Sequence, residues 1–204
     1  VDLSQMAPTY IDYPPATDDF ALTISVDGLL PDTEYFYDLA VEGSRSPSYS
    51  FVTAPEDGPS AFKFGFGSCT LRSDQPIFEY IDLAEPDLFL FIGDNHYGQT
   101  DDLSDLRQFY RWALERPFRG AMLDHTSILS TWDDNDYIGD NTDGNEPGKA
   151  ETYRAFQEYW ANPGYGTQSI EGVFYTHRYG DVEFFVLDDR YHREVNNNSI
   201  LGPS

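Results

Sequence analysis

The chain has 204 residues, enough for one ordinary domain or for one domain and part of a second. Its 12 basic and 36 acidic residues give a net charge of −24. Nucleic acids and anionic membranes would be repelled by this charge, so we expect no nucleic acid binding. The longest apolar run, Leu88–Ile92, is far shorter than the roughly 18 residues that a membrane helix needs. We therefore expect no membrane span.

The acidic composition leaves two interpretations open. Carboxylates suit hard cations and a saline or extracellular setting, but a merely solvated acidic surface has the same composition. Cys69 is the one cysteine of the chain, so the sequence excludes an internal disulfide and a four-cysteine zinc site. Its thiol is expected to be buried, reactive or bound to a metal.

Alternation of apolar and polar residues dominates the first 55 residues and predicts β-strands. The predicted strands are Phe20–Val26, Glu34–Val41 and Ser48–Thr53. A turn-rich segment, Pro55–Pro59, follows them and is typical of a linker. This part of the chain is therefore expected to be a β-sandwich.

The run Gly28–Tyr37, together with Phe51–Pro55, resembles the last strands of a fibronectin type III-like domain, in which a turn leads to a tyrosine-bearing strand. Tyr35 and Tyr37 are expected to lie in the sandwich core or at a tyrosine corner. A complete sandwich of this kind takes about 100 residues. We therefore expect residues 1–55 to be the C-terminal part of such a domain.

From Ser60 onward the pattern changes to strands that alternate with helices, which predicts an α/β layer architecture for residues 60–204. The predicted strands are Phe62–Phe66, Leu88–Ile92, Ser127–Thr131, Gly172–Tyr179 and Val182–Leu187. The predicted helices are Pro76–Ala84, Leu103–Glu115 and Lys149–Trp160. The fold class is thus mixed: a sandwich segment is followed by an α/β unit.

Polar side chains follow three of the predicted strands, within Phe64–Thr70, Leu90–Tyr97 and Leu129–Asp136. Ligands bind at the carboxyl ends of strands in open α/β sheets. We therefore expect the polar residues of all three segments to meet at one edge of the sheet and to form a site there.

The residue types of this expected site favour metal binding. The carboxylates of Asp94, Asp133, Asp134 and Asp136 and the amides of Asn135 and Asn141 are ligands for calcium or magnesium. A thiolate from Cys69 and a phenolate from Tyr97 would suit iron. Without a cation, so many carboxylates would repel one another and take up protons.

The order of these motifs resembles that of the alkaline phosphatase D family, the PhoD-like metallophosphoesterases. Gly67–Cys69 is similar to the family's Gly-Ser-Cys, Gly93–Tyr97 to its Gly-Asp-x-x-Tyr, and Trp132–Asp136 to its Trp-Asp-Asp-His-Asp. Downstream, Tyr159 with Trp160, and Val186–Arg190 with Arg193, resemble its Tyr-Trp and Leu-Asp-x-Arg-x-x-Arg stretches. The resemblance extends from Leu22 to Arg193.

The resemblance implies a secreted phosphomonoesterase or phosphodiesterase, extracellular or periplasmic, that uses iron (Fe³⁺) and calcium and acts on small phosphate esters. Carried over by position, Cys69, Asp94 and Tyr97 would bind the iron, and Asp94 would bridge to calcium. Asp134 and Asn141 complete the expected set of metal ligands. The fold implied is a metallophosphoesterase α/β sandwich behind a fibronectin-like domain.

The expected catalytic residues are Asp94, Asn135 and Arg190. Asn135 stands where the family usually has histidine, so an imidazole for proton transfer or charge stabilisation is missing unless His96 or another histidine substitutes for it. Arg190 would hold the substrate phosphate or form an ion pair with the neighbouring Asp188 and Asp189, and the sequence leaves both roles open.

The family's C-terminal half supplies further ligands from a Gly-Asp-x-His segment, and no such segment follows Arg193. We therefore expect the sequence to be part of a longer chain. An alternative function also stays open: a catalytically inactive, cation-binding adhesion or assembly module on the same fold. The fibronectin-like segment, the acidic surface and Asn135 favour this alternative, whereas the retained Cys69, Asp94 and Tyr97 favour the enzyme.

Overall fold

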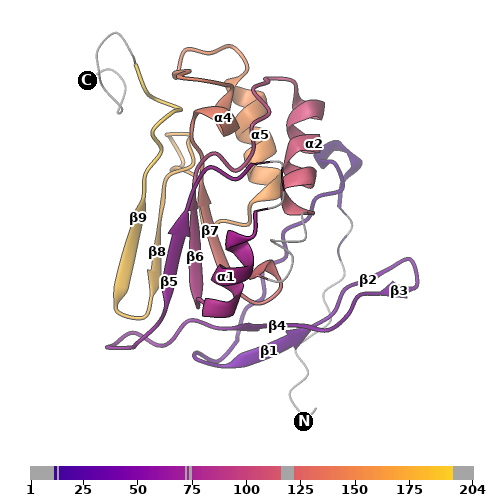
Figure 1. Ribbon diagram of the computed structural model, residues 1–204, viewed down its shortest axis with the longest axis vertical. Helices are drawn as coiled ribbons and strands as arrows, with labels where there is room; N and C mark the ends of the chain where they lie inside the picture. The colour runs from indigo at the N-terminus through magenta and orange to yellow at the C-terminus, as the bar shows by residue number, and fades with distance from the viewer. Residues whose placement is uncertain (1–11, 13, 72, 74, 116–121, 195–204) are drawn as a thin grey trace.

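A three-stranded parallel sheet forms the centre of the computed structural model, which describes residues 12, 14–71, 73, 75–115 and 122–194 (Figure 1). Its strands, in spatial order, are β5 (Phe64–Gly67), β6 (Leu88–Ile92) and β7 (Ser127–Thr131). The apolar run of β6 suits the central position, because Phe89 and Phe91 are buried on one face of the sheet and Leu88 on the other. The expected α/β architecture is confirmed for this part.

Helices cover one face of this sheet (Figure 1). They are α1 (Ile77–Ala84), α2 (Leu103–Leu114) and α5 (Lys149–Tyr159). Phe89 and Phe91 of β6 point into the larger core cluster, where they meet Phe156 of α5. The ring of Phe91 lies 5.4 Å from that of Trp160. These aromatic side chains hold the helical layer on the sheet.

The helix α2 follows its sequence pattern closely. Leu106 and Tyr110 have no exposed surface, as their spacing on one helical face predicts. The helix begins after Asp102, whose carboxylate accepts hydrogen bonds from the backbone N–H groups of Ser104 at 2.9 Å and Asp105 at 3.1 Å. This N-cap satisfies two donors that the first turn otherwise leaves unpaired.

The antiparallel hairpin of β8 (Tyr175–Tyr179) and β9 (Val182–Val186) packs on the opposite face. There the side chains of Leu88 and Leu129 meet Tyr175, Tyr179 and Val186 in a second, smaller core cluster. The hairpin was expected from the sequence, and the structure confirms it with strands that begin or end a few residues inside the predicted ranges.

The N-terminal part contains two separate two-stranded antiparallel pairs. One pairs β1 (Glu34–Tyr37) with β4 (Tyr49–Val52), and the other pairs β2 (Ala40–Val41) with β3 (Ser44–Arg45). In Figure 1 they lie below the central sheet. The phenol oxygen of Tyr35 accepts a hydrogen bond of 2.8 Å from the backbone N–H of Leu30, as at a tyrosine corner. The fibronectin-like sandwich stays a prediction, because two separate pairs do not make two packed sheets.

The predicted strand Phe20–Val26 is wrong. Residues 20–26 have no strand pairing, and Phe20 is 67% exposed with a positive φ of 60°. Alternation predicts a strand only where a neighbouring strand supplies hydrogen bonds, and the described residues provide no such neighbour for this segment. Before it lies a short 3₁₀ turn, η2 (Ala16–Asp18), which the sequence did not indicate.

The ends of both predicted domains, residues 1–11 and 195–204, lie outside the described residues. Within the part that is described, no helix is both long enough and apolar enough to cross a membrane.

Candidate metal centre

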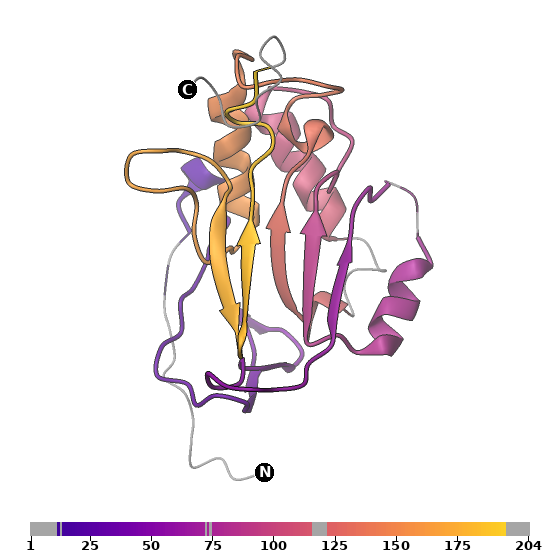
Figure 2. The ribbon, with the colours of Figure 1, turned by 90° about the vertical axis from the view of Figure 1, so that its left-hand side faces the viewer.

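The three parallel strands end at the same edge of the sheet, which is the upper edge in Figure 2. Cys69 follows β5, Asp94 follows β6, and Asp133 follows β7. Asp133 also begins a short helix, α4 (Asp134–Tyr137), which the sequence did not predict. The structure therefore brings the three polar segments together at one edge, as expected from their places after the strands.

Main-chain hydrogen bonds tie the segment after β5 to the segment after β6. The backbone N–H of Cys69 donates to the carbonyl of Gly93 at 3.2 Å, and that of Thr70 donates to the carbonyl of Asp94 at 2.9 Å. Cys69 and Asp94 have positive φ values of 63° and 52°. Non-glycine residues in this region are uncommon and gather at functional sites.

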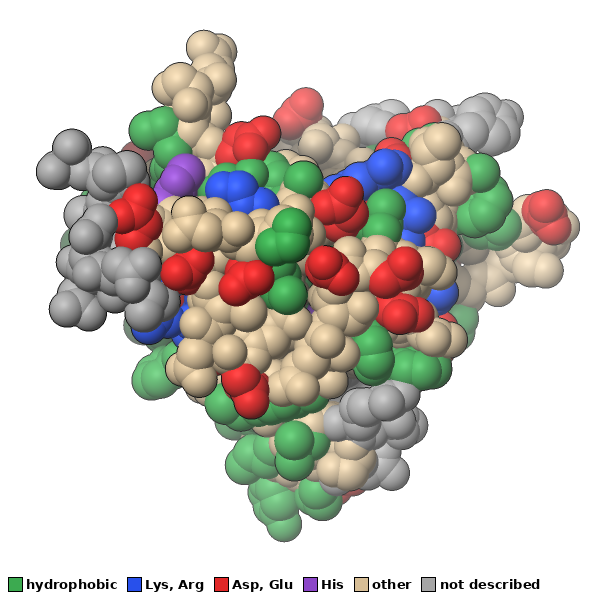
Figure 3. Space-filling model, turned by 90° about the horizontal axis from the view of Figure 1, so that it is seen from above, with side chains coloured by type: hydrophobic (Ala, Val, Ile, Leu, Met, Phe, Trp, Pro, Cys, Tyr) green, Lys and Arg blue, Asp and Glu red, His purple; other side chains and the backbone are tan. Residues whose placement is uncertain are grey.

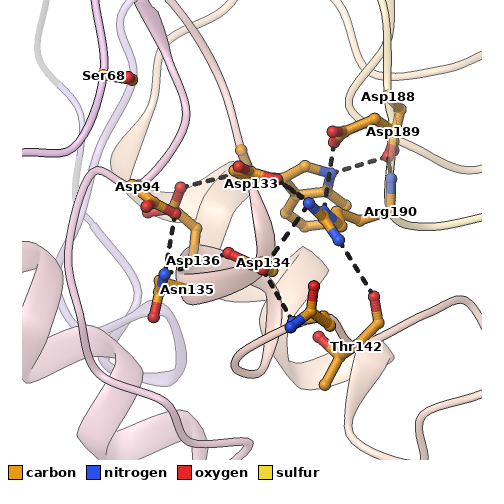
Figure 4. Close-up of polar contacts among 12 residues, drawn as sticks. Ser68, Asp94, Asp133, Asp134, Asn135, Asp136, Thr142, Asp188, Asp189 and Arg190 are labelled. Atoms are coloured by element: carbon orange, nitrogen blue, oxygen red, sulfur yellow. Dashed lines mark hydrogen bonds and ion pairs between the residues drawn. The ribbon is translucent and has the colours of Figure 1, made fainter.

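Three carboxylates converge at this edge. Asp94, Asp133 and Asp134 each place a ligand atom within 4.8 Å of the other two (Figure 4). Asp94 is 7% exposed, so part of this charge lies away from solvent. Carboxylate oxygens at such spacing suit a hard cation, which would offset their mutual repulsion. The donor set therefore fits a metal ion.

A thiol and a phenol lie next to the carboxylates. The Cys69 thiol donates to Oδ2 of Asp94 across 3.7 Å. Burial raises the pKa of Tyr97 well above its ordinary value, and side-chain hydrogen bonds between Tyr97 and both Cys69 and Asp94 raise it further. The structure thus gathers the three residues that were expected to bind iron, and sulfur, phenol and carboxylate together fit that metal.

Asn135 lies between two of the carboxylates. Its Nδ2 donates to Oδ1 of Asp94 at 3.2 Å and to Oδ1 of Asp134 at 3.1 Å (Figure 4). Its Oδ1 accepts a hydrogen bond of 3.0 Å from Nε2 of Gln99. Asn135 therefore supplies a neutral donor that does not titrate, at the position where the motif that it resembles has histidine.

Asp136 does not join the carboxylate group. One of its oxygens accepts from the backbone N–H groups of Asn95 at 2.7 Å and His96 at 3.1 Å, and the other accepts from Asp133 N and Asn95 Nδ2 at 3.1 and 3.2 Å. Burial raises its pKa well above the ordinary value, although the backbone hydrogen bonds oppose this shift. Asp136 was expected to provide a metal-binding oxygen. Instead, its carboxylate joins the loop after β6 to α4.

Arg190 forms an ion pair with Asp133, and its side chain is only 8% exposed. The guanidinium also lies 3.9 Å from Asp134 and 3.6 Å from Asp189, and it donates to the carbonyl of Thr142 at 3.5 Å (Figure 4). Of the two roles that the sequence left open, the described contacts are those of an ion pair, but its main partner is Asp133 and not the expected Asp188 or Asp189. Asp188 instead accepts a hydrogen bond of 2.9 Å from the backbone N–H of Arg190. A contact with substrate phosphate stays a prediction.

Asn141 reaches the centre through its main chain. Its backbone N–H donates to Oδ2 of Asp134 at 2.8 Å, and its φ is 60°. Ligation by its side chain stays a prediction. His96 packs its ring against Phe109 and Tyr110 of α2, with ring-centre distances of 5.7 and 4.4 Å, so it does not take the place of the missing imidazole.

Gly93 is required where β6 turns toward Asp94. Its φ is +101°, and a Cβ here would lie 2.6 Å from Cβ of Asp133, 2.7 Å from its backbone nitrogen and 2.8 Å from the carbonyl carbon of Trp132. We expect Gly93→Ala to lower the free energy of unfolding by about 3 kcal/mol, from the strained φ and from overpacking. Denaturant-induced unfolding measures this change.

Gly28→Ala is the matched control for Gly93. Gly28 has a φ of +76°, but an added Cβ would have nothing within 4 Å of it. Only backbone strain should therefore lower the free energy of unfolding of this variant, by about 1 kcal/mol. Equal losses of stability for the two variants would show that the close approach of Asp133 to Gly93 is not important.

Asp133 was expected as a carboxylate ligand from its residue type, although the ligand set carried over from the resemblance did not include it. The structure places it in the carboxylate group. Gln99 is a residue of the centre that was not expected from the sequence. Gln99 contacts Asn135 across 36 positions of sequence, and no pattern in the sequence indicates this contact.

Figure 3 views the molecule from the side of this edge, where Asp and Glu side chains gather and Lys and Arg side chains lie among them. A cation bound at the centre would lie in an acidic environment, which favours its binding.

The architecture is that of a PhoD-like metallophosphoesterase fold, over 90% of the chain. The solved structure of PhoD matches with a TM-score of 0.74 at 19% sequence identity, covering 90% of this chain and 42% of PhoD. A purple acid phosphatase, PPD1 from yellow lupin (Lupinus luteus) seeds, matches with a TM-score of 0.55 at 17% identity, covering 84% of this chain and 34% of that enzyme. The chain thus spans less than half the length of either protein. No protein-family model matches the sequence.

Proposed function

We propose that the protein hydrolyses phosphate esters in a metal-dependent reaction of the alkaline phosphatase D type, as a phosphomonoesterase or phosphodiesterase. One observation carries the proposal: Cys69, Asp94 and Tyr97 meet beside Asp133 and Asp134 at the strand ends of a PhoD-like fold. A thiol and a phenol beside three carboxylates have the composition of a metal centre and not of a solvated acidic surface.

The proposed metals are Fe³⁺ and calcium. Cys69 and Tyr97 supply the sulfur and phenol oxygen that suit iron, and Asp94 and Asp134 supply the carboxylates that suit either metal. When bound, such cations neutralise phosphoryl oxygens and lower the pKa of a coordinated water molecule.

The protein's own residues position these groups. Arg190 pairs with Asp133 and offsets part of the carboxylate charge. Asn135 donates to Asp94 and Asp134 and thereby fixes the orientation of both carboxylates. Because its amide has no titratable proton, Asn135 acts by donating hydrogen bonds and not by transferring protons.

Small phosphate esters are the proposed substrates, because a net charge of −24 opposes the approach of a long polyanion. We also propose that the protein is secreted, extracellular or periplasmic, and that residues 1–55 are the C-terminal part of a fibronectin III-like domain. Residues 60–204 would then be the N-terminal part of the PhoD-like metallophosphoesterase domain that follows it. The contact of Tyr35 with Leu30 supports the fibronectin-like assignment.

Metal removal tests the function. The full-length protein, loaded with Fe³⁺ and Ca²⁺, is expected to hydrolyse p-nitrophenyl phosphate or bis-p-nitrophenyl phosphate. Chelation should lower the rate to background, and re-addition of the two metals should restore it. A chelated protein that hydrolyses the esters as fast as the loaded one would contradict the proposal. Cation binding without turnover of either ester would support the inactive cation-binding module instead.

A further inference from the structure

Two side-chain amides connect the rim of the centre to its carboxylates. Nε2 of Gln99 donates to Oδ1 of Asp140 at 2.8 Å and to Oδ1 of Asn135 at 3.0 Å. Nδ2 of Asn135 then donates to the carboxylates of Asp94 and Asp134. Gln99 is exposed, with a φ of 49°, whereas Asn135 is 7% exposed. The connection therefore runs from the surface into the buried centre.

The two amides lie between the carboxylate of Asp140 at one end and those of Asp94 and Asp134 at the other. These carboxylates determine which way each amide places its oxygen and its nitrogen. An ionised carboxylate only accepts hydrogen bonds, and an amide has a donor at one end and an acceptor at the other. If the side-chain amide of Asn135 were flipped so that its oxygen and nitrogen exchanged places, its oxygen would face Asp94 and Asp134, and its NH₂ group would face that of Gln99. If the amide of Gln99 were flipped as well, its oxygen would face the carboxylate of Asp140, and two acceptors would then face each other. Only the observed direction pairs every donor with an acceptor.

We propose that Gln99 is a positioning residue of the metal centre, an inference that rests on the proposed function. Gln99 contacts Asn135 and acts through it: it keeps the Asn135 nitrogen turned toward Asp94 and Asp134. Those carboxylates are in turn held in the orientation that a cation needs. The site has an asparagine in place of the expected histidine, and Gln99 is the group that gives this asparagine a defined direction.

A direct test observes the Asn135 side chain itself. In ¹H–¹⁵N spectra of the full-length protein without added metal, the two Nδ2 protons of Asn135 are assigned by loss of the signals in Asn135→Ala. We expect Gln99→Met, which keeps the size and removes the donor, to shift these signals and to speed their exchange with water. Gln99→Glu, which replaces the donor with an acceptor, should change them more. Unchanged Asn135 signals in both variants would overturn the proposal.

A double-mutant cycle tests whether Gln99 acts through Asn135. Loss of a hydrogen bond of this kind predicts that Gln99→Met lowers kcat/KM by about threefold to tenfold. In the Asn135→Ala background, the same change is expected to have no further effect, because the amide that Gln99 orients is gone. Equal effects of Gln99→Met in the two backgrounds would show that Gln99 acts independently, against the proposal.

Gln157→Met is the matched control, since Gln157 is an exposed glutamine on α5. It should change neither the Asn135 signals nor kcat/KM. Unfolding midpoints of all variants separate positioning from stability, because a purely structural role for Gln99 would lower the midpoint and leave the Asn135 signals in place. If the wild-type protein hydrolyses no ester, the proposed function fails, while the Asn135 signals still decide the role of Gln99.

Discussion

Replacing Asp94 with asparagine is expected to abolish high-affinity cation binding and to lower ester hydrolysis by about a hundredfold or more. Asp94 lies in the middle of the candidate ligands: it contacts Cys69 at 3.7 Å and Asn135 at 3.2 Å, and the carboxylates of Asp133 and Asp134 place ligand atoms within 4.8 Å of its own. Removal of its charge takes one carboxylate from the donor set, and metal-bound charge supplies several kcal/mol to such reactions.

Asparagine is the informative replacement for Asp94. It keeps the size of the side chain, and it tolerates the left-handed backbone conformation, φ 52°, that alanine would find strained. Calorimetric titration with Ca²⁺ and steady-state hydrolysis of p-nitrophenyl phosphate measure the two effects. An unfolding midpoint close to that of the wild type shows that the fold is retained.

Asp181→Asn is the matched control, because it makes the same change in net charge at an exposed turn between β8 and β9. It should leave both measurements unchanged. Calcium binding by Asp94→Asn with the affinity of the wild type would place the cation elsewhere and would contradict the candidate centre.

The second large effect is expected for Asp136→Ala, as a loss of about 4 kcal/mol in the free energy of unfolding. The Asp136 side chain has no exposed surface and accepts hydrogen bonds from three backbone N–H groups and from Asn95 Nδ2. Alanine would leave these donors unpaired in the interior, and each unsatisfied group costs about 1 to 3 kcal/mol.

Chemical denaturation measures the stability of Asp136→Ala, and Asp136→Asn should be affected less, because its remaining oxygen can still accept. Glu183→Gln serves as the control, since Glu183 is an exposed acidic residue on β9 and should change stability by less than about 0.5 kcal/mol. A loss below about 1 kcal/mol for Asp136→Ala would show that solvent or rearranged neighbours satisfy the donors.

The central part of the fold was predictable from the sequence. The predicted bounds of β6 and β7 agree with the structure, and α2 and α5 differ from their predicted ranges only by one residue at the C-terminal end. These elements have strong patterns: a run of apolar residues in β6, and Leu106 and Tyr110 on one face of α2. Where the pattern is determined by burial, local sequence and tertiary structure agree.

The failures have tertiary causes. The segment Phe20–Val26 alternates as a strand does, but strand formation depends on a partner, which a local pattern does not reveal. The helix α4 was hidden by its composition, because Asp134–Tyr137 has three polar residues. Its first turn is closed by a hydrogen bond from the backbone N–H of Asp133 to the Asp136 carboxylate. Its four residues are too few for a helical period to be visible.

The sequence predicted which segments come together at the candidate site, but not which side chains pair with one another there. The places of Cys69, Asp94 and Asp133 after three strands indicated that they would meet, because parallel strands end at one edge. The sequence did not predict which partner each acidic residue would contact. Asp133 pairs with Arg190 across 57 positions, and Asp136 binds the loop after β6 across about 40. Such pairings are decided by packing.

The main-chain bonds between the segments after β5 and β6 have a consequence for the thermodynamics of cation binding. Cys69 and Asp94 are carried by backbone that is already fixed by the bonds from Cys69 to Gly93 and from Thr70 to Asp94. The conformational entropy of ordering these two candidate ligands is therefore lost when the chain folds, and would not have to be lost when a cation arrives. A centre built in this way would bind an ion as a preorganised host, so little protein ordering would oppose the association.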